Sequence, residues 1–255
     1  MRLGTVLKLN QGLHMMSVKS LAKKNFKSLA TVALLAGSIG LTSCLDDNNA
    51  PIEYPPSGFV SIFNGAPNNT GVIVFADSNR VNQTPLNYAQ ALPYSDYFPG
   101  DRVFKFSQSN SLTSLLEKEF EIKVDSVYSV FMLEDEDSLD AFLVRDNWSE
   151  PTANEAQLRM VNLSPDAGEV SLAISGEDGP TFSNLAFKTI SDFESIGSQR
   201  YNLALLSSEG DTLETATNVE LRGNRVYTLV VRGYELSTDN AKKLDLQLMT
   251  NYIEY

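Results

Sequence analysis

The chain has 255 residues, a formal net charge of −12, one cysteine and one histidine. Residues 1–43 hold the histidine, six of the 20 basic residues and none of the 32 acidic ones, so the other 212 residues carry a net charge of −18. This acidity argues against nucleic-acid binding, which needs basic patches. Histidine-based catalytic triads and ordinary zinc sites are also excluded in these 212 residues, because no histidine and no free thiol would remain after processing at Cys44.

The first 43 residues predict a signal peptide. Basic residues precede an apolar run from Leu29 to Leu41, and the run ends at Leu41-Thr42-Ser43-Cys44. A basic region, a short apolar region and small residues are typical of a secretory signal. The thirteen residues of this run would rise only about 20 Å as a helix, which is too short to cross a hydrocarbon core of roughly 30 Å.

The end of this segment resembles a bacterial lipobox. Leu41, Thr42 and Ser43 would be recognised by the signal peptidase, and the thiolate of Cys44 would be the nucleophile that accepts a lipid. The resemblance implies a mature chain that begins at an acylated Cys44, and two or more acyl chains give stable membrane anchoring. We therefore expect an outer-membrane lipoprotein, either periplasmic or exposed at the cell surface, with the lipid bilayer as a partner through Cys44.

Residues 44–58 predict a flexible tether, because three prolines and several polar residues leave little to bury. Asp46-Asp47 resembles an acidic signal for export to the cell surface, and a merely hydrophilic spacer is the alternative. From Phe59 onward apolar residues alternate with polar ones, which is typical of half-buried antiparallel strands. In Lys118–Val124 the alternation predicts that Phe120, Ile122 and Val124 point inward. Only residues 109–119 suggest a short helical turn.

The strand region contains an internal repeat of five blocks in the same order. The matched segments are Val60–Pro67 with Leu158–Pro165, Ser95–Tyr97 with Ser191–Phe193, Phe104 and Phe106 with Tyr201 and Leu203, Val127–Val130 with Val226–Leu229, and Leu139–Ala141 with Leu244–Leu246. The repeat predicts an all-β protein with two tandem domains, residues 59–147 and 157–255, joined by a linker at 148–156. Each domain would be a Greek-key β-sandwich of about seven strands, immunoglobulin-like or transthyretin-like.

The segment Arg159–Ala167 (RMVNLSPDA) resembles the opening of the family called domain of unknown function 4397. The second copy keeps Asn162 and Ser164–Ala167 of the family pattern, whereas Gly168 stands where a second proline is usual. The resemblance implies an extracytoplasmic tandem β-sandwich protein, and it assigns no activity. The first copy has Ala66 and Asn68 where the second has Ser164 and Asp166, which argues for a structural bend rather than a duplicated catalytic loop.

Two features are candidate binding sites. The run Glu134, Asp135, Glu136 and Asp137 offers oxygen ligands for calcium, but no glycine supplies the sharp turn of an EF-hand, and we favour a solvated hairpin. We therefore expect no cofactor. Trp148, the only tryptophan, is a candidate ligand platform, although a linker tryptophan more often fills the seam between domains. In the aromatic cluster Tyr94, Tyr97 and Phe98, we expect at least Tyr97 to be core, since the repeat equates it with Phe193.

Three short motifs resemble acceptor sequences for bacterial O-glycosylation, in which Asp precedes Ser or Thr and an apolar residue. Their acceptors would be Ser126, Ser138 and Thr212, with chance matches as the alternative. Together, the patterns favour a membrane-anchored, extracytoplasmic lipoprotein with a non-catalytic binding or structural role. The alternatives are a glycan-binding accessory lipoprotein of a polysaccharide-uptake system, a fimbrial-type adhesion subunit and, least favoured, a glycosidase that uses two carboxylates. A glycan or a protein is the expected ligand.

Overall fold

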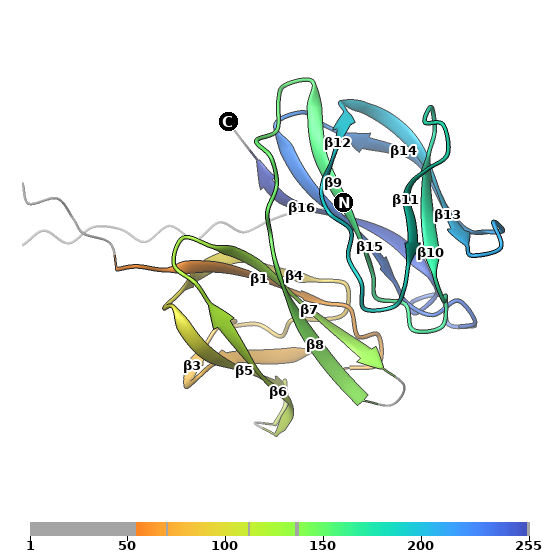
Figure 1. Cartoon of the computed structure of the whole chain (residues 1–255). Helices are drawn as coiled ribbons and strands as arrows, with labels where there is room; N and C mark the ends of the chain where they lie inside the picture. The colour runs from red at the N-terminus through yellow and green to blue at the C-terminus, as the bar shows by residue number, and fades with distance from the viewer. Residues whose placement is uncertain (1–54, 70, 112, 136–137, 254–255) are drawn as a thin grey trace, which may run out of the picture. The chain divides into compact units, whose positions relative to one another are not determined.

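The computed structural model describes residues 55–69, 71–111, 113–135 and 138–253. These residues lie in one compact unit, Glu53–Tyr255, and they form sixteen strands and no helix. None of the described residues therefore forms a helix long and apolar enough to cross a membrane. The strands build two β-sandwiches (Figure 1). The prediction of an all-β protein with two tandem sandwiches is confirmed.

The first sandwich contains eight strands in two four-stranded sheets. One sheet has the order β4-β1-β7-β8 and the other β3-β2-β5-β6. The strands are β1 (Gly58–Asn64), β2 (Val72–Ala76), β3 (Asn79–Arg80), β4 (Ala91–Tyr97), β5 (Gly100–Gln108), β6 (Ser114–Ile122), β7 (Val127–Asp135) and β8 (Ser138–Arg145).

The second sandwich repeats this plan strand for strand. Its sheets have the orders β12-β9-β15-β16 and β11-β10-β13-β14, so each strand has its equivalent eight strands earlier in the chain. The strands are β9 (Glu155–Asn162), β10 (Val170–Ile174), β11 (Pro180–Leu185), β12 (Glu194–Gly197), β13 (Gln199–Ser207), β14 (Thr212–Leu221), β15 (Arg225–Arg232) and β16 (Asp245–Ile253). The identical order is the structural counterpart of the sequence repeat.

The strand order corrects two expectations. Each sandwich contains one parallel pair, β1 with β7 and β9 with β15, so the sheets are not purely antiparallel. A parallel pair needs a crossover connection, which here runs through the opposite sheet of the same sandwich. The order also differs from the immunoglobulin arrangement, in which the first, second, fourth and fifth strands share a sheet. Of the two sandwich types expected, the transthyretin-like one remains.

Alternating side chains fill the space between the two sheets of each sandwich. The first core includes Val60, Ile62, Phe104 and Phe106, and the second includes the equivalent Leu158 and Met160. Ile122 is buried as predicted, but Val124 is 46% exposed because β6 ends at Ile122 and Val124 lies in the following turn. A helical turn was expected within residues 109–119. Residues 114–122 form a strand, so that prediction is wrong for residues 114–119.

The inner strands β1, β7, β9 and β15 are buried on both faces, because a third apolar cluster lies between the two sandwiches. Its fully buried members come from both copies: Phe63, Phe131, Leu133, Val161, Leu163 and Val230. These residues alternate along their strands with those of the two sandwich cores. The two copies therefore pack through the outer faces of the sheets that contain β1 and β9.

Strand pairing corrects the middle of the sequence repeat. Gly58 pairs with Tyr97 and its equivalent Ala156 pairs with Ile196, so Tyr97 corresponds to Ile196 and not to Phe193. Tyr97 is core, as predicted, and so is Ile196. By the same register Phe104 corresponds to Leu203 rather than Tyr201. The alignment of the two copies by sequence is wrong here, because aromatic and polar residues recur at nearby positions that are not equivalent in the fold.

Candidate binding surfaces and the interdomain polar network

The predicted lipidation site lies outside the described residues. Cys44 and the signal-peptidase residues Leu41, Thr42 and Ser43 all fall within residues 1–54. The acylation of Cys44 therefore stays a prediction from the sequence.

Trp148 lies among aromatic rings from both sandwiches. Its ring centroid is 6.5 Å from that of Tyr94 in the first copy. In the second copy, the centroid lies 5.8 Å from Phe193 and 5.9 Å from Tyr252, on which it stacks. The side chain is half-buried. This environment favours the seam-filling interpretation of Trp148 over the ligand platform, and it explains why Phe193 is not a core residue of its own sandwich.

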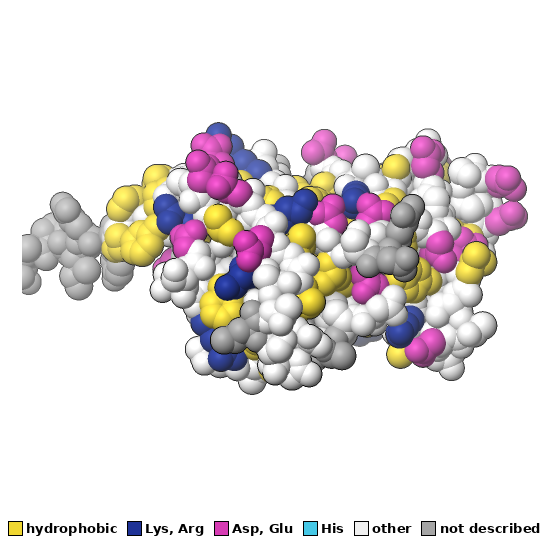
Figure 2. All heavy atoms as spheres, turned by 90° about the horizontal axis from the view of Figure 1, so that it is seen from below, with side chains coloured by type: hydrophobic (Ala, Val, Ile, Leu, Met, Phe, Trp, Pro, Cys, Tyr) yellow, Lys and Arg dark blue, Asp and Glu magenta, His cyan; other side chains and the backbone are white. Residues whose placement is uncertain are grey.

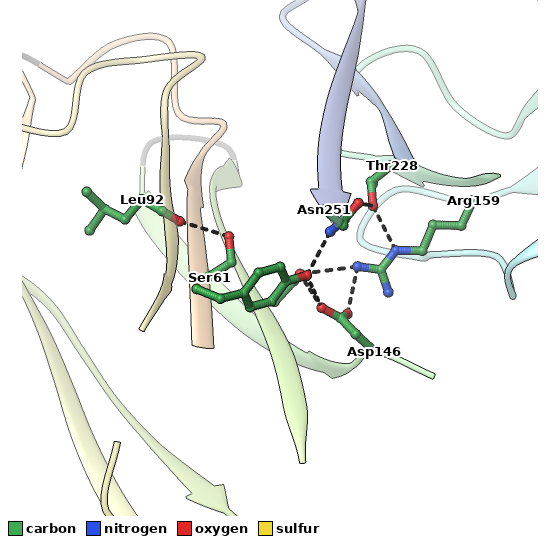
Figure 3. A network of polar contacts seen from close by, with 8 residues as sticks. Ser61, Leu92, Asp146, Arg159, Thr228 and Asn251 are labelled. Carbon is green, nitrogen blue, oxygen red and sulfur yellow. Dashed lines mark hydrogen bonds and ion pairs between the residues drawn. The ribbon is translucent and has the colours of Figure 1, made fainter. Parts of the chain in front are cut away.

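A buried ion pair joins the two sandwiches beside this aromatic group. Arg159 Nη2 lies 2.7 Å from Asp146 Oδ1, and the two side chains are only 2% and 0% exposed (Figure 3). Arg159 belongs to β9 of the second sandwich, and Asp146 directly follows β8 of the first. Removing two charges from water is costly, so such a pair persists only when further hydrogen bonds satisfy both groups.

Both groups make further hydrogen bonds, while Asp146 Oδ1 makes only the ion-pair contact with Arg159. Tyr94 Oη and Ser129 Oγ donate to Asp146 Oδ2 at 2.5 and 2.7 Å. Arg159 Nε donates to Thr228 Oγ1 at 2.9 Å, and its guanidinium lies 4.4 Å from the centroid of the Phe193 ring. Asn251 closes the network, accepting from Thr228 at 2.7 Å and donating to Tyr94 at 2.8 Å.

The network keeps the phenol of Tyr94 protonated. Burial raises the pKa of Tyr94, and the neighbouring Asp146 carboxylate raises it further, so the phenol stays a hydrogen-bond donor at neutral pH. The Asp146 oxygens face Arg159, Tyr94 and Ser129 rather than solvent. The arrangement fits a rigid joint between the two sandwiches. Sequence reasoning did not single out Arg159 or Asp146.

The acidic run is not wholly solvated, contrary to the favoured prediction. Glu134 is 8% exposed and accepts hydrogen bonds from the Asn68 backbone N–H at 3.1 Å and from the Asn68 side chain at 2.8 Å. Tyr234 of the second sandwich donates to the same carboxylate at 2.7 Å, and burial together with this carboxylate raises the tyrosine pKa. Glu136 and Asp137 lie outside the described residues.

Asp135, the next member of the run, also contacts the second sandwich. Its carboxylate lies 2.5 Å from Lys188 Nζ, which also lies 3.0 Å from Asp140. Among the residues described, no three acidic, histidine or cysteine side chains are grouped so as to hold a metal ion. Glu134 and Asp135 thus act as contacts between the copies.

We expect Asp140 to contribute to acid sensitivity. Burial opposes its ionisation, but hydrogen bonds from Lys118 and Lys188 outweigh burial and lower its pKa from 3.8 to about 2. A carboxyl with a lowered pKa stabilises the fold above its unfolded pKa, and this stabilisation is lost as the pH falls from 3.8 towards 2. In denaturation series from pH 6 to about 2, Asp140→Asn should flatten the acid loss of stability. An unchanged slope would contradict this role.

The repeated bend is built by a buried asparagine in each copy. The side-chain oxygen of Asn64 accepts the Ala66 N–H at 3.0 Å, and that of Asn162 accepts the Ser164 N–H at 3.0 Å. Both asparagines are 0% exposed. Asp166 accepts the backbone N–H groups of residues 235 and 236. This segment is therefore a structural bend, as predicted, and Asp166 ties it to the neighbouring loop.

The three candidate glycosylation acceptors differ in accessibility. Ser126 is only 4% exposed and donates its hydroxyl to the Val124 carbonyl at 3.2 Å, which makes it a poor acceptor in the folded protein. Ser138 begins β8 and Thr212 begins β14, and both side chains are exposed. Glycosylation at these two positions stays a prediction.

A shallow depression of about 290 Å³ lies on the first sandwich. Its lining includes Tyr97, Phe98 and the ion pair of Asp77 with Arg102, whose charged atoms are 2.8 Å apart. Phe98 is 66% exposed. The depression places an exposed ring beside a pair of charged side chains, and its lining includes two members of the predicted aromatic cluster.

Comparisons with known proteins agree with the sequence resemblance and add no activity. No match was found among curated proteins. A solved structure of a DUF3823 family protein from Bacteroides ovatus ATCC 8483 is 9% identical, covering 66% of this chain and 99% of its own, but its TM-score of 0.19 supports no inference. Residues 58–173, from β1 into β10, match the model of the family described as domain of unknown function (DUF4397), which agrees with the resemblance found in the sequence.

Proposed function

We propose that the protein is a membrane-anchored, extracytoplasmic lipoprotein with a non-catalytic binding or structural role. The observation that carries this proposal is the sequence Leu41-Thr42-Ser43-Cys44 at the end of a basic and apolar leader. The described fold begins eleven residues later, at Pro55, which leaves a short tether between the lipid and the first sandwich. Acyl chains on Cys44 would hold the protein at the outer membrane, on its periplasmic or outer side.

The buried acidic groups support a non-catalytic role. Among the described residues, the buried carboxylates are Glu134 and Asp146. Asp146 is held by Arg159, Tyr94 and Ser129, and Glu134 by Asn68 and Tyr234. Groups engaged in this way brace the joint between the sandwiches, and a general acid or base must instead reach a substrate proton.

Replacement of Cys44 tests the anchor. We expect Cys44→Ala, expressed in a bacterium that makes lipoproteins, to lose acylation, because the thiol is the only group that can accept the lipid. Metabolic labelling with a radioactive fatty acid should mark the parent protein and not the variant. Ser43→Ala is the matched control, since it keeps a small residue before the cysteine. Equal labelling of the parent and Cys44→Ala would refute the anchor.

A glycan-binding accessory role is the second candidate, and the depression beside Phe98 favours it. Aromatic faces stack on the apolar faces of sugars, and Asp77 with Arg102 would supply polar contacts. For the fimbrial-type alternative we find no such support in the described strands, because each sandwich has two four-stranded sheets over a filled core. A filled core offers no groove for a donated strand.

A further inference from the structure

We propose that one end of the first sandwich rests on the surface of the membrane that carries the anchor. This end, here called the apolar cap, consists of Pro55, Pro56, Phe98, Pro99 and Val124. The inference rests on the proposed lipid anchor and adds an orientation to it. Phe98 and Val124 are 66% and 46% exposed, and Pro55 and Pro56 are exposed as well.

Three separate segments converge to form the apolar cap. Gly58, just after the prolines, pairs with Tyr97 at the end of β4, so the prolines and Phe98 lie side by side. The Asp125 N–H donates to the Ser57 carbonyl at 2.9 Å, which brings the turn that contains Val124 to the same end. Pro55 and Phe98 also line a common hollow of about 270 Å³. Figure 2 shows hydrophobic side chains gathered where the described chain begins.

The second sandwich supplies an internal comparison. Strand register makes Phe98, Pro99 and Val124 equivalent to Gly197, Ser198 and Gly223. The turns themselves are alike, since Asp125 and its equivalent Asn224 both have positive φ, at 53° and 57°. The second sandwich therefore forms the same turns without apolar side chains at these positions. The apolar residues occur only in the copy that follows the tether, which indicates a role tied to that position.

The tether lets the apolar cap reach a bilayer. Eleven residue steps separate Cys44 from Pro55, and they span at most about 36 Å at ~3.3 Å per residue. Pro55 and Pro56 of the apolar cap are the described residues nearest to Cys44 along the chain. Aromatic side chains are favoured at the boundary between lipid and water, where an apolar ring meets the headgroups.

The charges around the apolar cap specify the lipid. Asp96, Asp101 and Asp125 are exposed beside it, and the exposed cations nearby are Lys123 and Arg80, of which Arg80 lines the same depression as Phe98. Carboxylates repel anionic headgroups. We therefore expect contact with zwitterionic lipid to exceed contact with anionic lipid, and the difference to shrink at high salt because screening weakens the repulsion.

Fluorescence quenching tests the orientation without relying on lipidation in cells. A chain that begins at Cys44 contains the whole compact unit with every described strand. Its only thiol is that of Cys44, so it can be coupled to maleimide headgroups in zwitterionic vesicles. In Phe98→Trp, the added tryptophan should be quenched by brominated lipid and shift its emission to the blue. Leu236→Trp is the matched control, because Leu236 is an apolar residue 81% exposed in the second sandwich.

The outcomes separate the apolar cap from the anchor. Quenching of Phe98→Trp above Leu236→Trp, abolished by Pro99→Ser with Val124→Gly, supports the proposal. Equal quenching at both positions overturns it, whether or not Cys44 proves to be acylated in cells. A blue shift of Phe98→Trp with soluble oligosaccharide but not with vesicles also overturns it, in favour of a sugar site. Near-ultraviolet circular dichroism checks that each variant keeps its fold.

Discussion

Asp146→Ala should destabilise the protein by about 3–5 kcal/mol, because it leaves the Arg159 guanidinium buried without its counter-charge. Arg159 is 1% exposed, and its other hydrogen bonds, to Thr228 and Ser129, offer only neutral partners. Urea denaturation followed by Trp148 fluorescence measures the loss, since Trp148 is the only tryptophan.

A second variant separates the lost charge from the lost packing. Replacing both partners, with Asp146→Leu and Arg159→Met, should recover part of the loss, because a pair of apolar side chains buries no unpaired charge. Arg222→Ala is the surface control, since Arg222 pairs with Glu220 at an exposed site and its loss should leave the denaturation midpoint nearly unchanged. A midpoint for Asp146→Ala equal to that of the control would contradict the role of the buried pair.

Phe131→Ala should cost about 3–5 kcal/mol and should weaken the contact between the sandwiches. Phe131 is 0% exposed in the cluster between the copies, with ring centroids 6.3 Å from Phe63 and 5.6 Å from Phe142. Truncation leaves a cavity at the joint itself, outside both sandwich cores. We therefore expect calorimetry to show one transition for the parent and two for the variant.

The control for this prediction is Phe98→Ala, an aromatic truncation at a site that is 66% exposed. It should leave both the transition temperature and the number of transitions unchanged. If Phe131→Ala melts in a single transition close to that of the parent, the sandwiches do not depend on this cluster for their contact.

The two tandem sandwiches could be predicted from the sequence, because the alternation of apolar residues and the internal repeat are both retained wherever a strand packs on a core. Val60 and Leu158, or Val130 and Leu229, differ in identity but keep the same inward position. The repeat was misaligned at Tyr97 because Phe193 is also aromatic and lies three residues before the true equivalent, Ile196. Only the pairing of strands could distinguish these positions.

The joint between the copies could not be predicted with the same ease. Inner strands such as β7 contain long apolar runs, which indicate burial on both faces. The runs do not show which other part of the chain covers the second face. The signal for the ion pair was weak but present. Arg159 is a charged residue inside the otherwise uncharged segment Ala156–Ser164, where a surface strand would alternate charges. Its partner Asp146 lies beyond a strand end, where acids are common.

Cys44 and the residues before it gave the clearest functional signal, and they lie outside the described fold. The most direct test of the account is the intact mass of the protein extracted from bacterial membranes. We predict a chain that begins at residue 44 and carries the added mass of its acyl groups. A chain that retains residues 1–43, or one that begins at an unmodified Cys44, would contradict the account.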